Sequence, residues 1–479
     1  MNYRMISYIL GWILIFEGLF LSVPMLTAIV YGESVLPSYL IAMGICFLIG
    51  GLLVFKKPKK KQLFAREGCV IVALSWIVLS AFGALPFLMT RESPTFIDAL
   101  FETVSGFTTT GASILSDVEK LSHASLMWRS FTHWVGGMGV LVFMLTILPM
   151  SGGYHMNLMR AESPGPSVER FVPTVKSTAK ILYGIYICLS LLELLLLLVG
   201  KMPMFDALTL TFGTAGTGGF GIKNDSIGSY TTYQQTVITI FMILFGVNFN
   251  VYFLFLLKKI RQGLKNEELR AYLGIILGAI LLITVNIAGK FGNPFLAFHH
   301  AAFQVGSIIT TTGYSTVDFN TWPTFSKTVL VLLMLIGASA GSTGGGIKVS
   351  RIVILAKSVK KELKQYLHPH SISKIKMDGK PVEHEVVRSI NVFLIAYLLI
   401  YAVSMLIVSL DNFDFTTTFT SVAATINNIG PGLDLVGPAA NFGILSVPSK
   451  LVLIFDMLAG RLEIFPLLLL FVPDTWRKF

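Results

Sequence analysis

Four short glycine-centred turns contain the residues of this chain that are best suited to bind a ligand. Their central residues are Gly111, Gly219, Gly313 and Gly430, and each follows a short apolar segment. Threonine, glycine, asparagine and aromatic residues surround these glycines, and none of the four turns carries an acidic or basic side chain. Whatever the turns bind must therefore be bound by backbone carbonyl groups and hydroxyl groups rather than by carboxylates.

Backbone carbonyl groups of this kind can hold a dehydrated cation. A cation entering a narrow pore loses its water, and rings of carbonyl oxygens replace that shell for K⁺. Glycine tolerates the dihedral angles that point successive carbonyls inward, and a short helix before each turn would aim its partly negative C-terminus at the same point. Near-neutral turns suit a monovalent cation better than a divalent one.

We therefore expect the four turns to meet on one axis and to line a cation filter. A single Thr-Thr-Thr-Gly run would carry little weight, because a helix that ends in a glycine cap gives the same pattern. Four copies in matching contexts favour the filter. The predicted filter residues are Thr109, Thr110, Gly111, Gly218, Gly219, Phe220, Thr311, Thr312, Gly313, Tyr314, Asn428, Ile429 and Gly430.

The elements that position these turns must be membrane helices. Charged residues make up 13% of the chain and hydrophobic residues 54%, whereas soluble domains contain roughly 25% charged residues. Lysine and arginine gather in alternate loops, around residues 56–66, 160–180, 258–270 and 357–388. This bias marks cytosolic loops and predicts a multi-pass membrane protein with both termini in the cytosol. The net charge of +11 is thereby explained without a nucleic-acid partner.

The order of apolar segments predicts an N-terminal hairpin followed by four similar units. Residues 5–30 and 38–55 form the hairpin, with no glycine turn between them. Each later unit consists of an outer helix, a half-helix too short to span a bilayer, the glycine turn and a returning helix. Outer helices are expected at 69–89, 182–199, 272–288 and 392–410; half-helices at 96–107, from Pro203, from Pro294 and at 413–424; returning helices at 126–150, 236–257, inward from Lys327 and at 451–471.

The predicted fold is thus an all-α polytopic membrane protein. Four pseudo-repeats of helix, re-entrant pore loop and helix surround one pore, and the two-helix hairpin stands apart from them. Non-helical backbone at membrane depth is tolerated only where protein or water encloses it, so four such breaks require a shared enclosed space. The expected divisions are 1–66 for the hairpin and 67–165, 166–265, 266–380 and 381–479 for the four pore repeats.

A run of small residues from Gly337 to Gly346 breaks the returning helix of the third unit. It does not have the spacing of a phosphate-binding loop, and no strand precedes it. Close packing of neighbouring helices through small residues is one interpretation; a mobile plug beneath the filter is the other. Lys348 and Arg351 follow the run and either contact the plug or mark the cytosolic interface.

Arg461 lies deep in the apolar segment 451–471, about as far from either end as the segment allows. A charge at that depth pairs with another group or faces a water-filled space. One interpretation is an ion pair with an acid on another helix. The other, which we favour, is a positive charge that faces the pore below the filter and impedes cations until it moves.

The sequence resembles a known family. The four turns, together with the stretches Trp-Val-Gly-Gly-Met-Gly at 134–139, Ala-Glu-Ser-Pro-Gly-Pro at 161–166 and Gly-Ser-Thr-Gly-Gly-Gly-Ile-Lys at 341–348, resemble the Trk/Ktr/HKT superfamily of K⁺ transporters. The resemblance covers essentially the whole chain and is greatest for the bacterial TrkH/TrkG branch. Gly111 stands where Na⁺-selective plant relatives have serine, whereas Asn-Asn-Ile-Gly-Pro in the fourth turn departs from the usual form.

The resemblance implies a K⁺-translocating pore subunit of a Trk-type uptake system in the cell (inner) membrane. K⁺ would be bound by filter carbonyls, with no organic cofactor in this chain. The loop after Gly337 would be the gate, and the subunit a homodimer with one pore per subunit. A cytosolic ring of nucleotide-binding, Rossmann-type (RCK) subunits would dock on the loops 150–180 and 357–388. The implied gate residues are Gly341, Gly344, Gly345, Gly346, Lys348 and Arg461.

Two other function classes, a coupled secondary transporter and an enzyme, fit the sequence less well than a pore. A secondary transporter that couples K⁺ to H⁺ or Na⁺ needs a titratable relay along the path. Glu17, Glu193 and Asp456 are the obvious membrane acids, but none lies in the turns, and Glu17 could simply reach the membrane interface. An enzyme is not expected, because the sequence shows no paired catalytic carboxylates or metal-spaced histidines at membrane depth.

Overall fold

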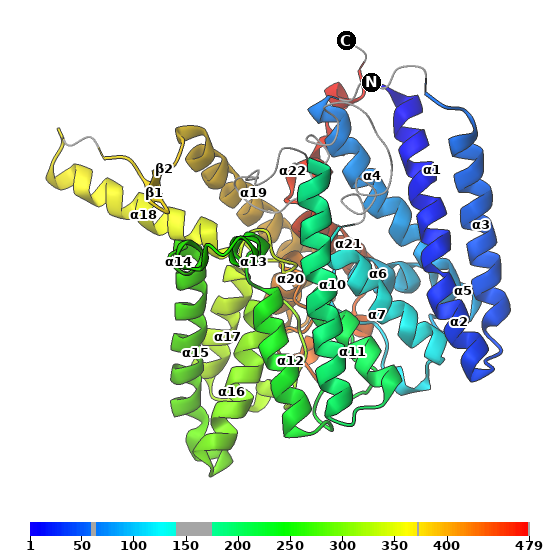
Figure 1. Cartoon of the computed structure of the whole chain (residues 1–479), viewed down its shortest axis with the longest axis horizontal. Coiled ribbons are helices and arrows are strands. Elements are labelled where there is room, and N and C mark those ends of the chain that lie inside the picture. Colours follow the sequence, from blue (N-terminus) through cyan, green and yellow to red (C-terminus); the bar gives the residue numbers. More distant parts are fainter. Residues whose placement is uncertain (59–63, 140–174, 371–372, 478–479) are drawn as a thin grey trace.

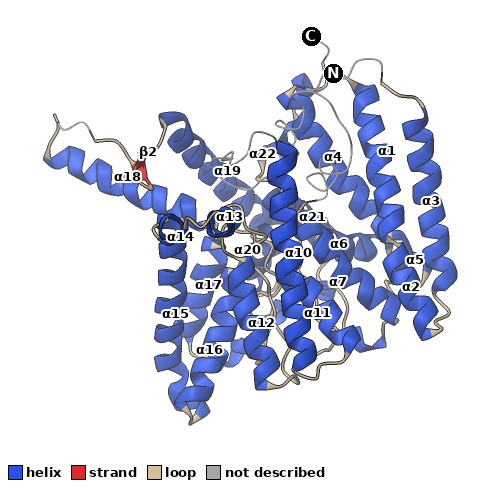
Figure 2. Ribbon diagram, viewed as in Figure 1, coloured by secondary structure: helices blue, strands red, loops and turns tan. Residues whose placement is uncertain are grey.

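The structure is a computed structural model that describes residues 1–58, 64–139, 175–370 and 373–477. Most of it is helical (Figure 2), and the described strands are the two-residue pair β1 (Lys376–Met377) and β2 (Lys380–Pro381), which are antiparallel. The second half of the helix expected at 126–150, most of the loop 150–180 and the 161–166 motif lie outside the described residues.

The N-terminal hairpin forms as predicted. It consists of α1 (Tyr3–Phe20), α2 (Ser22–Tyr31) and α3 (Leu36–Phe55), and it lies at one edge of the molecule (Figure 1). α1 packs on α3 and on the first helix of the next unit. The two ends of the chain meet there, because the Tyr3 hydroxyl donates to the Trp476 carbonyl over 2.7 Å.

The outer helices of the four units are long enough to cross a bilayer. They are α4 (Ala65–Gly83), continued by α5 (Leu85–Met89), then α10 (Val175–Val199), α15 (Glu267–Phe291) and α19 (His384–Val408). With the hairpin they give six spans among the described residues, or seven if one bent pair is counted as a span. The prediction of a multi-pass, all-α membrane protein is consistent with this arrangement.

A half-helix follows each outer helix. The four are α6 (Phe96–Phe107), α11 (Met204–Gly216), α16 (Pro294–Ile309) and α20 (Phe415–Ile426). The first three begin at or within one residue of the predicted positions, and their N-cap residues are Thr95, Pro203 and Asn293. The fourth begins two residues later than predicted, because the Asp414 side chain accepts from the Thr417 amide over 3.0 Å and caps the helix there.

The returning helices all end midway, which the sequence interpretation recognised only for the third unit. They are α7 (His123–Gly137), α12 (Thr232–Phe245), α17 (Thr324–Ile336) and α21 (Val447–Arg461). The continuous helix expected at 236–257 is wrong: after α12 the chain bends by 89° into α13 (Phe249–Leu256). Gly246 ends one helix, and the Asn248 side chain caps the next by accepting from the Asn250 amide.

The continuous helix expected at 451–471 is wrong for a related reason. α21 stops at Arg461, and Glu463 and Ile464 then adopt left-handed backbone conformations, with φ of 59° and 68°. The chain resumes as the short α22 (Phe465–Leu468). Pro466 at the start of α22 has no amide hydrogen with which to extend the earlier helix.

The third unit carries a projection that extends beyond the helix bundle. α18 (Val349–Leu367) and the β1–β2 hairpin extend sideways from the bundle, at the level of α13 and α14 (Ile260–Leu264) (Figure 1). Short 3₁₀ segments complete the described elements: η1 (Val118–Lys120), η2 (Phe319–Thr321), η3 (Ser409–Asp411), η4 (Asp434–Val436), η5 (Phe442–Ile444), η6 (Leu469–Phe471) and η7 (Pro473–Thr475).

Candidate functional site

The four half-helices end in one shared backbone conformation. The residue two before each central glycine is left-handed, with φ between 54° and 59°: Thr109, Thr217, Thr311 and Asn428. The amide of the next residue donates to the carbonyl five residues earlier over 2.8–2.9 Å, as in Thr110 to Ser105. Glycine usually occupies the left-handed position of such helix ends. A non-glycine residue there costs roughly 1–2 kcal/mol, so four copies of the same strain indicate a functional constraint.

The central glycines lie against one another's turns in a closed ring. Each has a positive φ, from 78° at Gly219 to 101° at Gly430, and each faces a carbonyl oxygen of the next turn. A Cβ atom would meet that oxygen at 2.0 Å from Gly111 to Gly218, 1.9 Å from Gly219 to Thr312, 2.1 Å from Gly313 to Ile429 and 2.8 Å from Gly430 to Thr110. The last of these contacts returns to the first turn, so the order closes on itself and excludes any side chain at these positions.

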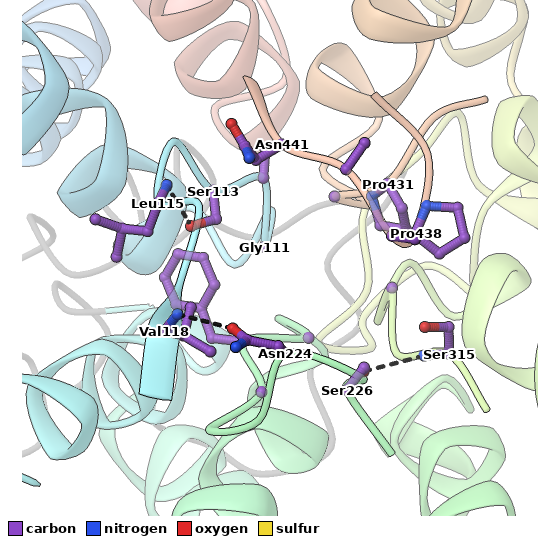
Figure 3. Close-up of a pocket in the computed structure, with 18 of the residues that line it drawn as sticks. Gly111, Ser113, Leu115, Val118, Asn224, Ser226, Ser315, Pro431, Pro438 and Asn441 are labelled. Atoms are coloured by element: carbon purple, nitrogen blue, oxygen red, sulfur yellow. Dashed lines mark hydrogen bonds between the residues drawn. The ribbon is translucent and has the colours of Figure 1, made fainter. Parts of the chain in front are cut away.

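An open cavity of about 830 Å³, including the solvent space at its mouth, lies beside this ring. All four central glycines line it. Figure 3 shows Gly111, Asn224, Ser315 and Pro431, one from each unit, around the same opening. The bond from the Ser315 amide to the Ser226 hydroxyl (3.2 Å) joins the third unit to the second at its rim. The cavity gives a small hydrated solute access to the ring of turns.

The predicted filter side chains support the ring from behind. Tyr314 is fully buried, and its hydroxyl donates to the Leu210 carbonyl of the second half-helix over 3.3 Å. The Asn428 side-chain Nδ2 donates to the Thr110 hydroxyl over 2.9 Å and so joins the fourth turn to the first. The side chains thus make contacts between the units, and the backbone of the central glycines faces the cavity.

The loop of small residues lies directly against the third and fourth turns. The Gly345 amide donates to the Thr311 hydroxyl over 2.6 Å. A Cβ on Gly344 would lie 2.7 Å from the Thr310 carbonyl oxygen, and one on Gly345 would lie 2.4 Å from that of Asn427. Glycine is thus required here for close approach.

Both predicted gate cations, Arg461 and Lys348, donate hydrogen bonds to carbonyl groups of this loop. The Arg461 guanidinium donates to the Thr343 carbonyl and, in the first unit, to the Gly137 carbonyl, both over 2.9 Å. The Lys348 ammonium donates to the Gly344 carbonyl. Of the two interpretations of Lys348, contact with the loop is therefore the one that the structure supports.

Gly341 and Gly346 complete the predicted gate residues, and both have left-handed backbone, with φ of 66° and 79°. The Gly341 carbonyl accepts from the Phe249 amide over 3.1 Å. The break between α12 and α13 therefore holds the middle of the loop, a contact that the sequence interpretation did not anticipate.

Glu268 is the residue that the sequence interpretation missed. It lies in the first turn of α15 and is buried, and one carboxylate oxygen accepts from the Ala340 amide (2.6 Å) and the Ser350 amide (3.2 Å). Its other oxygen accepts from the Asn248 side chain over 3.0 Å. Glu268 thus holds the backbone of the loop itself and that of the first turn of α18, which follows it. An acid at the start of an apolar segment was the available signal, but such acids usually only begin a helix.

The three membrane acids lie away from the cavity. Glu17, Glu193 and Asp456 are fully buried, and none of them lines it. The interpretation that Glu17 reaches the membrane interface is wrong, because its carboxylate lies 2.9 Å from where a Cβ on Gly83 of α4 would stand. The Asp456 carboxylate accepts from the Ser404 hydroxyl over 2.7 Å. Among the described residues, no cluster of histidine, cysteine and acidic side chains could hold a metal ion.

Comparison with known proteins identifies the family. The model of the family described as TrkH, cation transport protein, matches residues 36–291 and 293–478. The Trk system potassium uptake protein TrkH of Escherichia coli K12 is 37% identical over the full length of both chains, and TrkG of the same organism is 34% identical over 99% of each. The crystal structure of the potassium transporter TrkH from Vibrio parahaemolyticus superposes over 100% of both chains, with a TM-score of 0.89 and 33% identity. The predicted membrane fold and the resemblance are confirmed, and the chain belongs to the TrkH family of cation transport proteins.

Proposed function

We propose that this chain is the K⁺-translocating transmembrane subunit of a Trk-type potassium uptake system. K⁺ is the ion expected from a family whose relatives are named potassium uptake proteins. The observation that carries the proposal is the closed ring in which each central glycine faces a carbonyl oxygen of the next turn. Four neutral, carbonyl-lined turns around one opening have the chemistry required to replace the hydration shell of K⁺.

The backbone carbonyls of the predicted filter residues are the proposed K⁺ ligands. In this proposal, Thr110, Gly218, Thr312 and Ile429 supply one ring of oxygens, because each precedes a central glycine and lies against the neighbouring turn. The C-terminal ends of the four half-helices add partial negative charge toward the same point. The division of the chain at residues 66, 165, 265 and 380 into a hairpin and four pore repeats belongs to the same proposal.

The loop from Gly337 to Gly346 is the proposed gate. Its contacts with Thr311 and with the Asn427 carbonyl support a position across the inner side of the ring. Arg461 and Lys348 hold the loop through its carbonyls and add positive charge that opposes the passage of cations. Opening then requires the loop and these two cations to move together.

The proposed oligomer and its regulatory partner follow from the resemblance to the family. We propose a homodimer with one pore per subunit, in the cell (inner) membrane, with both termini cytosolic. The basic projection of α18 and the β1–β2 hairpin is the described part of the surface on which a ring of nucleotide-binding Rossmann-type subunits would dock. No organic cofactor is proposed for this chain.

A carrier that couples K⁺ to H⁺ or Na⁺ is less well supported. Glu17, Glu193 and Asp456 do not line the cavity that reaches the ring. The chain is not an enzyme, because its relatives are named as transport proteins.

Rubidium flux into proteoliposomes tests the proposal. Gly111→Ser and Gly313→Ser place a Cβ within about 2 Å of a neighbouring carbonyl oxygen, so both should lower the ratio of K⁺ to Na⁺ flux. Gly278→Ser is the control, because open space surrounds that position in α15. Unchanged selectivity in both filter variants would refute the filter, and uptake that requires an imposed proton gradient would favour the coupled carrier.

A further inference from the structure

A buried ion pair joins the first two turns, and neither of its residues is among the filter or gate residues described above. Arg129 also lines the cavity beside the ring. Glu102 of α6 and Arg129 of α7 are 1% and 3% exposed, and the Arg129 Nε donates to the Glu102 carboxylate over 2.8 Å. Burying two charges costs several kcal/mol per ion unless the geometry is excellent and further hydrogen bonds are made. The surrounding contacts meet that condition and indicate what the pair holds.

The Glu102 carboxylate fixes the chain that leaves the first turn. It accepts from the Ser113 hydroxyl and from the Ile114 amide, each over 3.1 Å. Ser113 and Ile114 directly follow the turn centred on Gly111. The carboxylate thereby ties both ends of the first turn together, because Glu102 itself belongs to the half-helix that enters it.

The Arg129 guanidinium carries this connection to the second turn. Its Nη1 donates to the Gly221 carbonyl over 3.1 Å, and its carbon lies 4.1 Å from the centre of the Phe220 ring. Phe220 and Gly221 directly follow Gly219. A planar guanidinium can bond the carboxylate and this carbonyl at once, whereas the ammonium of a lysine cannot present the same fixed fork.

The hydrogen bonds made directly by residues of the other turns are neutral. The Tyr314 hydroxyl and the Ser226–Ser315 bond join the second and third turns. The Asn428–Thr110 bond joins the fourth turn to the first. A charge-assisted clamp is stronger and shorter than such neutral bonds, so it fixes the spacing between the first and second turns more firmly.

We propose that Glu102 and Arg129 are specificity-determining positioning residues, which hold the carbonyl oxygens of the first and second turns at the separation that favours K⁺ over Na⁺. The inference rests on the proposed filter. Na⁺ is smaller, so it is bound well only if the ring contracts. A clamp that resists contraction at this junction raises the free energy of Na⁺ in the site without affecting K⁺.

The test compares Arg129→Lys with the wild-type chain in proteoliposomes, by the ratio of K⁺ to Na⁺ flux. The lysine keeps the charge but loses the fork, so we expect the ratio to fall by roughly tenfold, the scale of one charge-assisted hydrogen bond. Asp98→Asn is the matched control, because Asp98 lies in the same half-helix and forms another buried ion pair, with Lys450 at 2.7 Å. It should lower thermal stability and leave the ratio unchanged.

A second readout separates positioning from general stability. Ions that occupy the filter stabilise the folded protein, so K⁺ should raise the melting temperature of the detergent-solubilised wild type more than Na⁺ does. Arg129→Lys should reduce that difference, and Asp98→Asn should keep it. Glu102→Gln, which keeps the size of the side chain and removes its charge, is the second variant if Arg129→Lys does not fold.

The possible results are distinct. A lowered ratio in the clamp variants with an unchanged ratio in Asp98→Asn supports the proposal. An unchanged ratio in a folded clamp variant overturns it, and so does failure of both clamp variants to fold, which would assign the pair to stability alone. If Gly111→Ser also leaves the ratio unchanged, then the filter itself is wrong; if Gly111→Ser lowers it, then only the clamp is.

Discussion

The Arg461 guanidinium donates to the Thr343 carbonyl over 2.9 Å, although the two residues lie 118 positions apart in the chain. Arg461 ends the returning helix of the fourth unit, and Thr343 belongs to the loop that interrupts the third. Since Arg461 also bonds the Gly137 carbonyl at the end of α7, one side chain joins the ends of two returning helices to the loop. The loop is therefore held at the points where two returning helices end.

Arg461→Ala should raise basal cation flux. The variant removes charged hydrogen bonds from Arg461 to carbonyls, and such bonds contribute about 1.5–3 kcal/mol each. If one of them is present only in the closed state, flux should rise roughly tenfold or more. Rubidium uptake without any regulatory subunit measures this. Arg388→Ala, at an exposed position near the start of α19, is the control and should not change flux; a silent, folded Arg461→Ala would remove Arg461 from gating.

Glu268→Gln should loosen the loop as well. The carboxylate accepts from an amide of the loop, from an amide of α18 and from the Asn248 side chain, and a glutamine offers only one acceptor oxygen. We expect faster hydrogen exchange in residues 339–347 and a rise in basal flux of several-fold, consistent with the loss of about 1 kcal/mol. Glu267→Gln is the control, because Glu267 pairs with Lys357 at a partly exposed position, where ion pairs contribute little. Equal exchange rates in both variants would contradict this role for Glu268.

Thr311→Val and Thr109→Val form a matched pair. Both threonines have left-handed backbone two residues before a central glycine. The Thr311 hydroxyl accepts from the Gly345 amide over 2.6 Å, whereas the Thr109 hydroxyl has no hydrogen-bond partner among the described residues. Valine has the same shape, so only Thr311→Val should leave a loop amide unsatisfied, at a cost of about 1–3 kcal/mol. Single-channel recording should show a larger open fraction in Thr311→Val; the same change in both variants would argue against this contact.

The proposed orientation can be tested by labelling introduced cysteines. In a background without the three native cysteines, Lys374→Cys on the basic projection should react with a membrane-impermeant thiol reagent only from the cytosolic side. Asp225→Cys, which is exposed beside the outer cavity, should react only from the other side. Basic loops are retained in the cytosol during insertion, and labelling of both positions from the same side would disprove the orientation.

The positions of the half-helices and of the glycine turns after them could be predicted from the sequence, whereas the breaks in three of the returning helices could not. Proline and N-capping residues fix the starts of the half-helices, and the limited length of each apolar run shows that it cannot span the bilayer. The glycines at 111, 219, 313 and 430 mark the turns because no other residue fits their backbone. All of these signals are local, so they can be recognised without any knowledge of the fold.

The contacts of the turns, and the side chains that hold the turns in place, became known only from the tertiary structure. The contact between Gly111 and the Gly218 carbonyl, like that between Gly345 and the Asn427 carbonyl, involves backbone atoms, which every residue has, so no side-chain pattern reveals it. The clamp of Glu102 with Arg129 and the hold of Glu268 on the loop join segments far apart in the chain. These charged groups interact strongly only after burial has removed water from around them, and burial is a property of the packed molecule.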